Sequence, residues 1–215
     1  MKNKKVIVFD LDDTLMYELD FLKSAYKEIA RVVDISNEDF LFEKMLNNYF
    51  LGNNVFQMLK DDYPNFEVQD LLQLYRNHYP QLTLDINVET VLIFCKNKGY
   101  KIGLISDGRS KTQRNKLKAL EIETFFDLIV ISEEFGSEKP TRANFEVFHQ
   151  YKANEYIYVA DNTNKDFITP NVLGWTSICL RDAGVNIHKQ DFRLKKEFLP
   201  KMVIENIIEL VEIIN

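Results

Sequence analysis

Five short apolar runs constrain the fold of this chain more than any other feature of its sequence. They span residues 5–10, 101–106, 127–132, 156–160 and 176–180. Together they are rich in valine and isoleucine, and they lack the polar–apolar alternation of a half-exposed strand. Uninterrupted apolar runs of this kind are typical of strands that a parallel sheet buries on both faces. We therefore predict five strands of one buried, mostly parallel sheet.

Helical patterns fill most of the gaps between these runs. Residues 88–99 end on Gly99, a residue that commonly ends helices, and residues 111–120 and 142–152 are further helix candidates. Strands that alternate with helices indicate an α/β fold with a doubly wound, Rossmann-like sheet. The tail, residues 203–214, repeats isoleucine at helical spacing, which predicts an amphipathic helix docked on the core.

One long region interrupts the alternation of strands and helices. Between Tyr17 and Asp85 we find no strand pattern, and apolar residues recur at helical spacing in residues 19–33, 54–63 and 68–75. In open α/β sheets, ligands bind at the carboxyl ends of the strands. A helical insertion that follows the first strand directly is therefore expected to lie over that edge as a lid.

Composition narrows the possible partners and compartments. The chain of 215 residues has a formal net charge of −6, which argues against a nucleic-acid partner and against an anionic membrane surface. Its apolar runs are too short for a signal peptide or a membrane span. The two cysteines, Cys95 and Cys179, lie far apart in apolar surroundings and predict buried free thiols. We expect a cytoplasmic protein.

Polar and charged residues follow four of the five predicted strands. A parallel sheet brings the carboxyl ends of its strands to one edge, so these residues are expected to lie close together. Each group alone could be a solvated turn, but four groups in corresponding places point to a common site. The groups are Asp10-Leu11-Asp12-Asp13-Thr14, Ser106-Asp107-Gly108, Lys139-Pro140, and residues 161–166, which begin with Asp161-Asn162 and end with Asp166.

These strand ends resemble the motifs of the haloacid dehalogenase superfamily of hydrolases, in the branch whose helical cap is inserted after the first strand. The resemblance covers nearly the whole chain and implies a core of residues 1–16 and 86–215 and a cap of residues 17–85. The matching residues are Asp10, Asp12 and Thr14 of D-x-D-x-T, the strand-closing Ser106, Lys139 before a proline, and Asp161 and Asp166 of D-x-x-x-x-D.

The resemblance assigns a catalytic role to each motif. Asp10 would attack phosphorus and form an aspartyl-phosphate, and Asp12 would protonate the leaving oxygen and later activate water. Lys139 would offset charge on the nucleophile and on the transferring group. Ser106, together with the backbone N–H groups of Asp107 and Gly108, would hold phosphoryl oxygens.

A metal ion is the implied cofactor, because carboxylates and a phosphate would otherwise repel one another. Mg²⁺ prefers hard oxygen ligands of this kind. Asp10 and Asp161 would ligate it directly, Asp166 directly or through another group, and Asp12 through its backbone carbonyl. Asn162 is a candidate for orienting Asp161 or a metal-bound water.

Neighbouring polar residues have simpler interpretations. We interpret Asp13 as a turn-capping or supporting acid and Thr14 as a brace of the turn. Arg109 is as well explained by a solvated side chain as by a substrate contact. For Arg76 and His78, a place on a helix surface is favoured over contact with substrate.

The leading function is a Mg²⁺-dependent phosphatase that acts on a small phosphorylated metabolite, as a monomer or homodimer. A phosphomutase shares the aspartyl-phosphate step and is the nearest alternative. A 2-haloacid dehalogenase is disfavoured, because members with that chemistry lack the second aspartate and need no metal. A non-catalytic member is disfavoured because six costly polar groups are all present.

Overall fold

A six-stranded parallel sheet forms the centre of the fold, in the order β3-β2-β1-β4-β5-β6. The structure, a computed structural model, describes residues 4–215; residues 1–3 of the predicted core range lie outside the described residues. Strand β1 is central, and its Ile7 pairs with Ile102 of β2 on one side and Ile157 of β4 on the other. All five strand pairings are parallel, so the predicted α/β sheet is confirmed. The strands are β1 Lys5–Phe9, β2 Lys101–Ser106, β3 Leu128–Ile131, β4 Glu155–Ala160, β5 Thr176–Leu180 and β6 Met202–Ile204.

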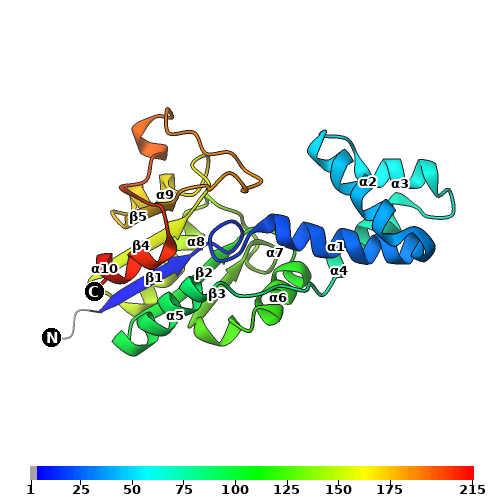
Figure 1. Cartoon of the computed structure of the whole chain (residues 1–215). Helices are drawn as coiled ribbons and strands as arrows, with labels where there is room; N and C mark the ends of the chain where they lie inside the picture. The colour runs from blue at the N-terminus through cyan, green and yellow to red at the C-terminus, as the bar shows by residue number, and fades with distance from the viewer. Residues whose placement is uncertain (1–3) are drawn as a thin grey trace.

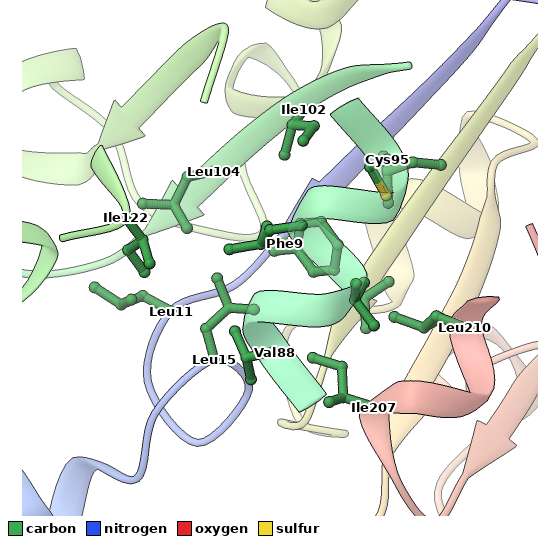
Figure 2. Close-up of a cluster of buried hydrophobic side chains, with 14 of the residues drawn as sticks. Phe9, Leu11, Leu15, Val88, Cys95, Ile102, Leu104, Ile122, Ile207 and Leu210 are labelled. Carbon is green, nitrogen blue, oxygen red and sulfur yellow. The ribbon is translucent and has the colours of Figure 1, made fainter. Parts of the chain in front are cut away.

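Helices cover both faces of the sheet (Figure 1). On one face, Phe9 and Leu104 pack with α5 and with the C-terminal segment that carries Leu210, as Figure 2 shows. On the other face, aromatic residues dominate, among them Phe145, Phe148 and Trp175. Successive strand residues face opposite clusters, which explains why the runs are apolar without alternation. The helices around the sheet are α5 Ile86–Lys98, α6 Ser110–Ala119, α7 Ser132–Phe135, α8 Ala143–Glu146, α9 Ile168–Val172 and α10 Leu210–Ile213.

Four α-helices lie between β1 and α5, ahead of the second strand. Figure 1 shows α1 leaving the edge of the sheet and carrying α2, α3 and α4 away from it. These helices bury their own apolar cluster, which includes Tyr26, Ile29 and Met45. We call residues 18–77 the helical segment. Its helices are α1 Glu18–Val33, α2 Glu38–Phe50, α3 Val55–Asp62 and α4 Val68–Asn77.

The C-terminal tail differs from the sequence prediction. Residues 203–214 were expected to form one helix, but residues 202–204 extend the sheet as β6, and Ile178 of β5 pairs with Met202. A capping box between Asn206 and Glu209 then starts a 3₁₀ turn, Ile207–Glu209, which leads into the short α10. The single-helix prediction was wrong for two reasons. Ile204 pairs with Leu180 at the edge of the sheet, and Asn206 caps a new helical turn only after that strand ends.

Two further helix predictions need correction. Residues 142–152 form the short α8 and then a 3₁₀ helix, Val147–Tyr151, rather than one continuous helix. The helix α2 was not among the three helical stripes that the sequence suggested for residues 17–85. Over residues 4–215, no helix has both the length and the apolar character that crossing a bilayer needs.

Candidate active site

The predicted strand ends meet at one edge of the sheet. Asp10 directly follows β1, Ser106 closes β2, and Asp161 directly follows β4. Strands β1 and β4 are neighbours from which the chain proceeds in opposite directions, to β2 and β3 on one side and to β5 and β6 on the other. Such a reversal of strand order leaves a crevice at the carboxyl edge where α/β proteins bind ligands.

Three buried carboxylates form the centre of this edge. Asp10, Asp161 and Asp166 each offer an oxygen, and these oxygens lie within 4.8 Å of one another. Lys139 joins the group: its Nζ lies 2.8 Å from Asp10 Oδ1 and 2.9 Å from Asp166 Oδ1. Three buried carboxyl groups, two of them in contact with one ammonium, form a water-poor cluster of oxygen atoms, which fits a divalent cation with oxygen ligands.

Burial perturbs the acids of this cluster. Burial raises the pKa of Asp10 to about 7, although the charge of Lys139 opposes the change. Burial and the neighbouring Asp10 and Asp166 raise the pKa of Asp161 to about 9. Burial alone would lower the pKa of Lys139, but Asp10 and Asp166, together with Tyr158 and Asp107, outweigh burial and raise that pKa well above its usual value. The cluster therefore gains from any further positive charge.

Asp166 supports its neighbours with both of its oxygens. Oδ1 pairs with Lys139, and Oδ2 accepts a hydrogen bond of 3.0 Å from the backbone N–H of Asn162. The side chain of Asn162 accepts from Asn164 N–H at 3.0 Å and so shapes the same loop. The carboxylate of Asp161 receives a hydrogen bond of 3.0 Å from Asn186 Nδ2, so Asn186 contacts the residue that Asn162 is expected to orient.

The carboxylate of Asp12 lies outside the three-carboxylate cluster. Its Oδ1 lies 2.6 Å from Lys116 Nζ, and its Oδ2 accepts a hydrogen bond of 2.8 Å from Gln113 Nε2. The same Nε2 lies 2.5 Å from Ser106 Oγ. Two residues of α6 therefore hold Asp12, and one of them, Gln113, also links it to Ser106, the serine at the end of β2.

The loop after β2 is already engaged in hydrogen bonds. Gly108 N–H, expected to hold a phosphoryl oxygen, donates to Ser132 Oγ at 2.9 Å. The carboxylate of Asp107 accepts from Lys139 N–H at 3.0 Å and from Lys165 Nζ at 2.7 Å. Asp107 thus fixes the loop that carries Lys139.

Asp13 has the supporting role that its position suggested. It adopts a positive φ of 54°, and its carboxylate accepts hydrogen bonds from Glu18 N–H at 2.9 Å and Ile187 N–H at 3.0 Å. The Asp13 carboxylate therefore connects the start of α1 to the loop that contains Asn186. The hydroxyl of Thr14 is buried without a hydrogen-bond partner in the described residues, so the hydrogen bond of Thr14 within the turn comes from its backbone N–H, which donates to the carbonyl of Leu11 at 3.4 Å.

Comparisons with known proteins agree with this geometry. The sequence profile described as haloacid dehalogenase-like hydrolase matches residues 7–179, most of the chain. The chain belongs to the haloacid dehalogenase-like hydrolase family.

Relatives in the family carry phosphatase names. A glyceraldehyde 3-phosphate phosphatase of Methanocaldococcus jannaschii is 29% identical over 81% of this chain and 83% of its own length. One of Methanothermobacter thermautotrophicus is 27% identical over 98% of this chain and 99% of its own. A solved structure titled as a predicted phosphoglycolate phosphatase from Haemophilus somnus matches with a TM-score of 0.69 at 19% identity, over 100% of both chains.

The predicted family, the hydrolase class and the phosphatase assignment within the haloacid dehalogenase-like hydrolases are therefore confirmed. The buried acidic triad gives this hydrolase a place for a divalent cation, and its named relatives act on phosphorylated small molecules.

Three residues of this hydrolase escaped sequence reasoning: Gln113, Lys116 and Asn186. The first two lie on the buried side of α6, where a polar side chain has no motif to mark it. One signal was present in the sequence. Residues 111–120 hold few apolar residues, so a helix there that packs on a sheet must bury polar side chains. Asn186 lies in a loop far from the motifs, and no local pattern identifies it.

Other candidate residues have partners outside the cluster. Arg109 pairs with Glu133 at 2.7 Å and is exposed, as the solvated interpretation proposed. His78 lies 2.7 Å from Ser24 Oγ, at the return from the helical segment, and the backbone carbonyl of Arg76 accepts from Thr112 Oγ1 at 2.9 Å.

Proposed function

We propose that this hydrolase is a Mg²⁺-dependent phosphatase that releases phosphate from a small metabolite through an aspartyl-phosphate on Asp10. We further propose that residues 17–85 act as a cap over a core of residues 1–16 and 86–215. The observation that carries the proposal is the buried triad Asp10, Asp161 and Asp166 in contact with Lys139. Burial on this scale costs stability and is typical of a functional site.

The reaction has two displacements at phosphorus. In the first, a carboxylate oxygen of Asp10 bonds to phosphorus, the phosphorus–oxygen bond of the ester breaks, and Asp12 gives its proton to the leaving oxygen. In the second, water bonds to phosphorus and loses a proton to Asp12, while the acyl phosphate bond breaks and frees Asp10. Ser106, Asp107, Gly108 and Lys139 are the proposed phosphate-binding group, with Lys139 nearest the nucleophile.

The proposed metal ligands are Asp10 and Asp161, with the backbone carbonyl of Asp12. Asp166 is proposed to act through Lys139 and the loop at Asn162, because both of its oxygens already have partners. When bound, Mg²⁺ supplies positive charge that offsets repulsion between these carboxylates and the substrate's phosphoryl oxygens.

The substrate is proposed to be a small phosphorylated metabolite. Relatives named glyceraldehyde 3-phosphate phosphatases make a three-carbon aldehyde phosphate the first compound to test. We also propose a reducing, cytoplasmic compartment, which is supported by the free and buried state of Cys95 and Cys179.

The test is a turnover assay of purified protein on glyceraldehyde 3-phosphate and a panel of sugar phosphates, with Mg²⁺ and with EDTA. We expect phosphate release with Mg²⁺, loss of release with EDTA, and recovery when Mg²⁺ is restored. Equal rates with and without chelator would refute the metal requirement.

The same assay in ¹⁸O-water separates a phosphatase from a phosphomutase. If water is the final acceptor of the phosphoryl group, the released phosphate carries one ¹⁸O atom. Isomerised sugar phosphate with little free phosphate would instead identify a mutase.

A further inference from the structure

Asp12 is held from one side by a single helix. The two α6 residues that donate to it, Gln113 and Lys116, are each 2% exposed. Both oxygens of Asp12 are engaged, Oδ1 by Lys116 and Oδ2 by Gln113. An acid–base group needs one oxygen free to exchange a proton with substrate, so at least one of these bonds must be released in turnover.

The two donors differ in what else they contact. Gln113 Nε2 lies 2.5 Å from Ser106 Oγ, so the bond to Oδ2 lies beside the proposed phosphate site. Lys116 Nζ lies over the ring of Phe21, 4.6 Å from its centroid, on the side of the helical segment. The ammonium is thus enclosed between a carboxylate and an aromatic face, an arrangement that strengthens when water is excluded.

The position of α6 is itself fixed by hydrogen bonds to the end of the helical segment and to His78, which follows it. Thr112 Oγ1 donates to the carbonyl of Arg76 at 2.9 Å, and Asn115 Nδ2 donates to the carbonyls of Asn77 at 3.2 Å and His78 at 2.9 Å. Lys116 follows directly and reaches Asp12 from this anchored turn. Its ammonium therefore has little freedom to leave Oδ1.

We propose that Lys116 is a positioning residue that anchors Oδ1 of Asp12 and leaves Oδ2 as the oxygen that exchanges protons with substrate and water. This inference rests on the proposed function, in which Asp12 is the acid and base. Gln113 holds Oδ2 until the leaving-group oxygen takes its place. In the first displacement the proton on Oδ2 passes to that oxygen as its bond to phosphorus breaks, while Oδ1 keeps the bond from Lys116.

Leaving groups of different basicity test this role. An alkyl phosphate releases a strongly basic alkoxide that needs the proton, whereas 4-nitrophenolate leaves without one. In single-turnover experiments with Mg²⁺ and excess enzyme, Lys116→Met is expected to slow alcohol release from the best alkyl phosphate by about tenfold to a hundredfold. Release of 4-nitrophenol is expected to stay within about threefold of wild type, because its barrier depends little on a placed acid.

Three further variants complete the test. Lys116→Arg keeps a cation and is expected to recover most of the alkyl rate. Lys118→Met removes an exposed lysine of the same helix and is expected to leave both rates unchanged. In an Asp12→Asn background, Lys116→Met is expected to add less than about a threefold loss, since the two residues act as one unit.

Equal slowing of alcohol and 4-nitrophenol release would overturn the proposal and give Lys116 a purely structural role. Additive losses in the Asp12→Asn background would do the same. If Lys116→Met does not fold, Lys116→Gln gives the same comparison, because the readout is the ratio of the two rates within one variant. Failure of the proposed function is distinguishable, since wild-type enzyme would then show no metal-dependent turnover of either ester.

Discussion

At the scale of single residues, the site buries ionisable groups that its chemistry uses, and their burial lowers the stability of the fold. Asp10 is buried beside Asp161 and Asp166, and burial raises its pKa to about 7, far from the usual range of a carboxyl group. A carboxylate in such a place is costly unless it is paired, and Lys139 is shared between Asp10 and Asp166. The arrangement is understandable if the charge is needed for catalysis.

The substitution Asp10→Asn is expected to abolish turnover while keeping the fold. It removes the nucleophile but preserves shape, so kcat should fall by roughly a thousandfold or more. Without metal, the free energy of unfolding should stay within about 1 kcal/mol of wild type or rise, because one buried like charge disappears. Activity and urea unfolding of metal-free protein measure the two effects.

Asp39→Asn, on the exposed surface of α2, is the matched control for the loss of a carboxylate. Retained activity in Asp10→Asn would exclude the nucleophile. A large loss of stability would give Asp10 a structural role instead.

The residue types at the strand ends predicted the cluster well, because packing alone rarely places carboxylates directly after buried apolar strands. Asp10, Lys139, Asp161 and Asp166 do lie together. What the sequence could not reveal is which partner each one takes. Lys116 could pair with any nearby acid of a folded chain, and its contact with Asp12 depends on how α6 is placed.

At the scale of elements, the aromatic face of the sheet depends on a glycine within β2. A Cβ on Gly103 would lie 2.1 Å from Cε1 of Phe148, a buried residue of the 3₁₀ helix Val147–Tyr151. The glycine thus allows the aromatic ring to lie directly on the strand. Packing this close has no room for one more methyl group.

Gly103→Ala is therefore expected to destabilise the protein by about 1–3 kcal/mol through overpacking. Chemical unfolding of the variant measures the loss. In a Phe148→Leu background the ring is gone, so the same substitution should cost less, and the two effects should not add. Additive losses would mean that strain in β2 itself, and not the ring, is responsible.

Strand prediction succeeded where apolar runs were long and failed where they were short. The three residues of β6 belong to an apolar tail whose pattern also fits a helix. Pairing with β5 is what makes these residues a strand. The restart at Asn206 could have been predicted, since Asn206 and Glu209 have the spacing of a capping box. Missing α2 has a different cause: its buried residues, Leu41, Met45 and Leu46, form a narrow stripe.

At the scale of the whole molecule, a polar junction joins the helical segment to the sheet. Ser24 Oγ accepts from Gln81 N–H at 2.8 Å and also lies 2.7 Å from His78 Nε2, within hydrogen-bond distance. Asn115 of α6 holds the carbonyl of His78. Burial lowers the pKa of His78 below its ordinary 6.5, so the folded protein favours the neutral ring.

This junction predicts a loss of stability in mild acid. A folded-state pKa below the unfolded one means that the contribution of His78 is present above pH 6.5 and is lost as pH falls through the folded-state value. The fall in unfolding free energy between pH ~7.5 and ~5 should be smaller in His78→Gln than in wild type. Unfolding in urea at both pH values, with His188→Gln as the exposed control, measures the difference. An unchanged pH dependence in His78→Gln would contradict the assignment.

The central position of β1 has a consequence for synthesis on the ribosome. This strand is made first, yet its partners β2 and β4 begin at residues 101 and 155. At roughly 5–20 residues per second, the nascent chain waits about 8–30 s before both edges of β1 can pair. During that interval a strand destined for complete burial is exposed, while α1 to α4 can already associate. Nascent chains of this topology therefore depend on protection of their first strand, and chaperone contact is expected to concentrate there.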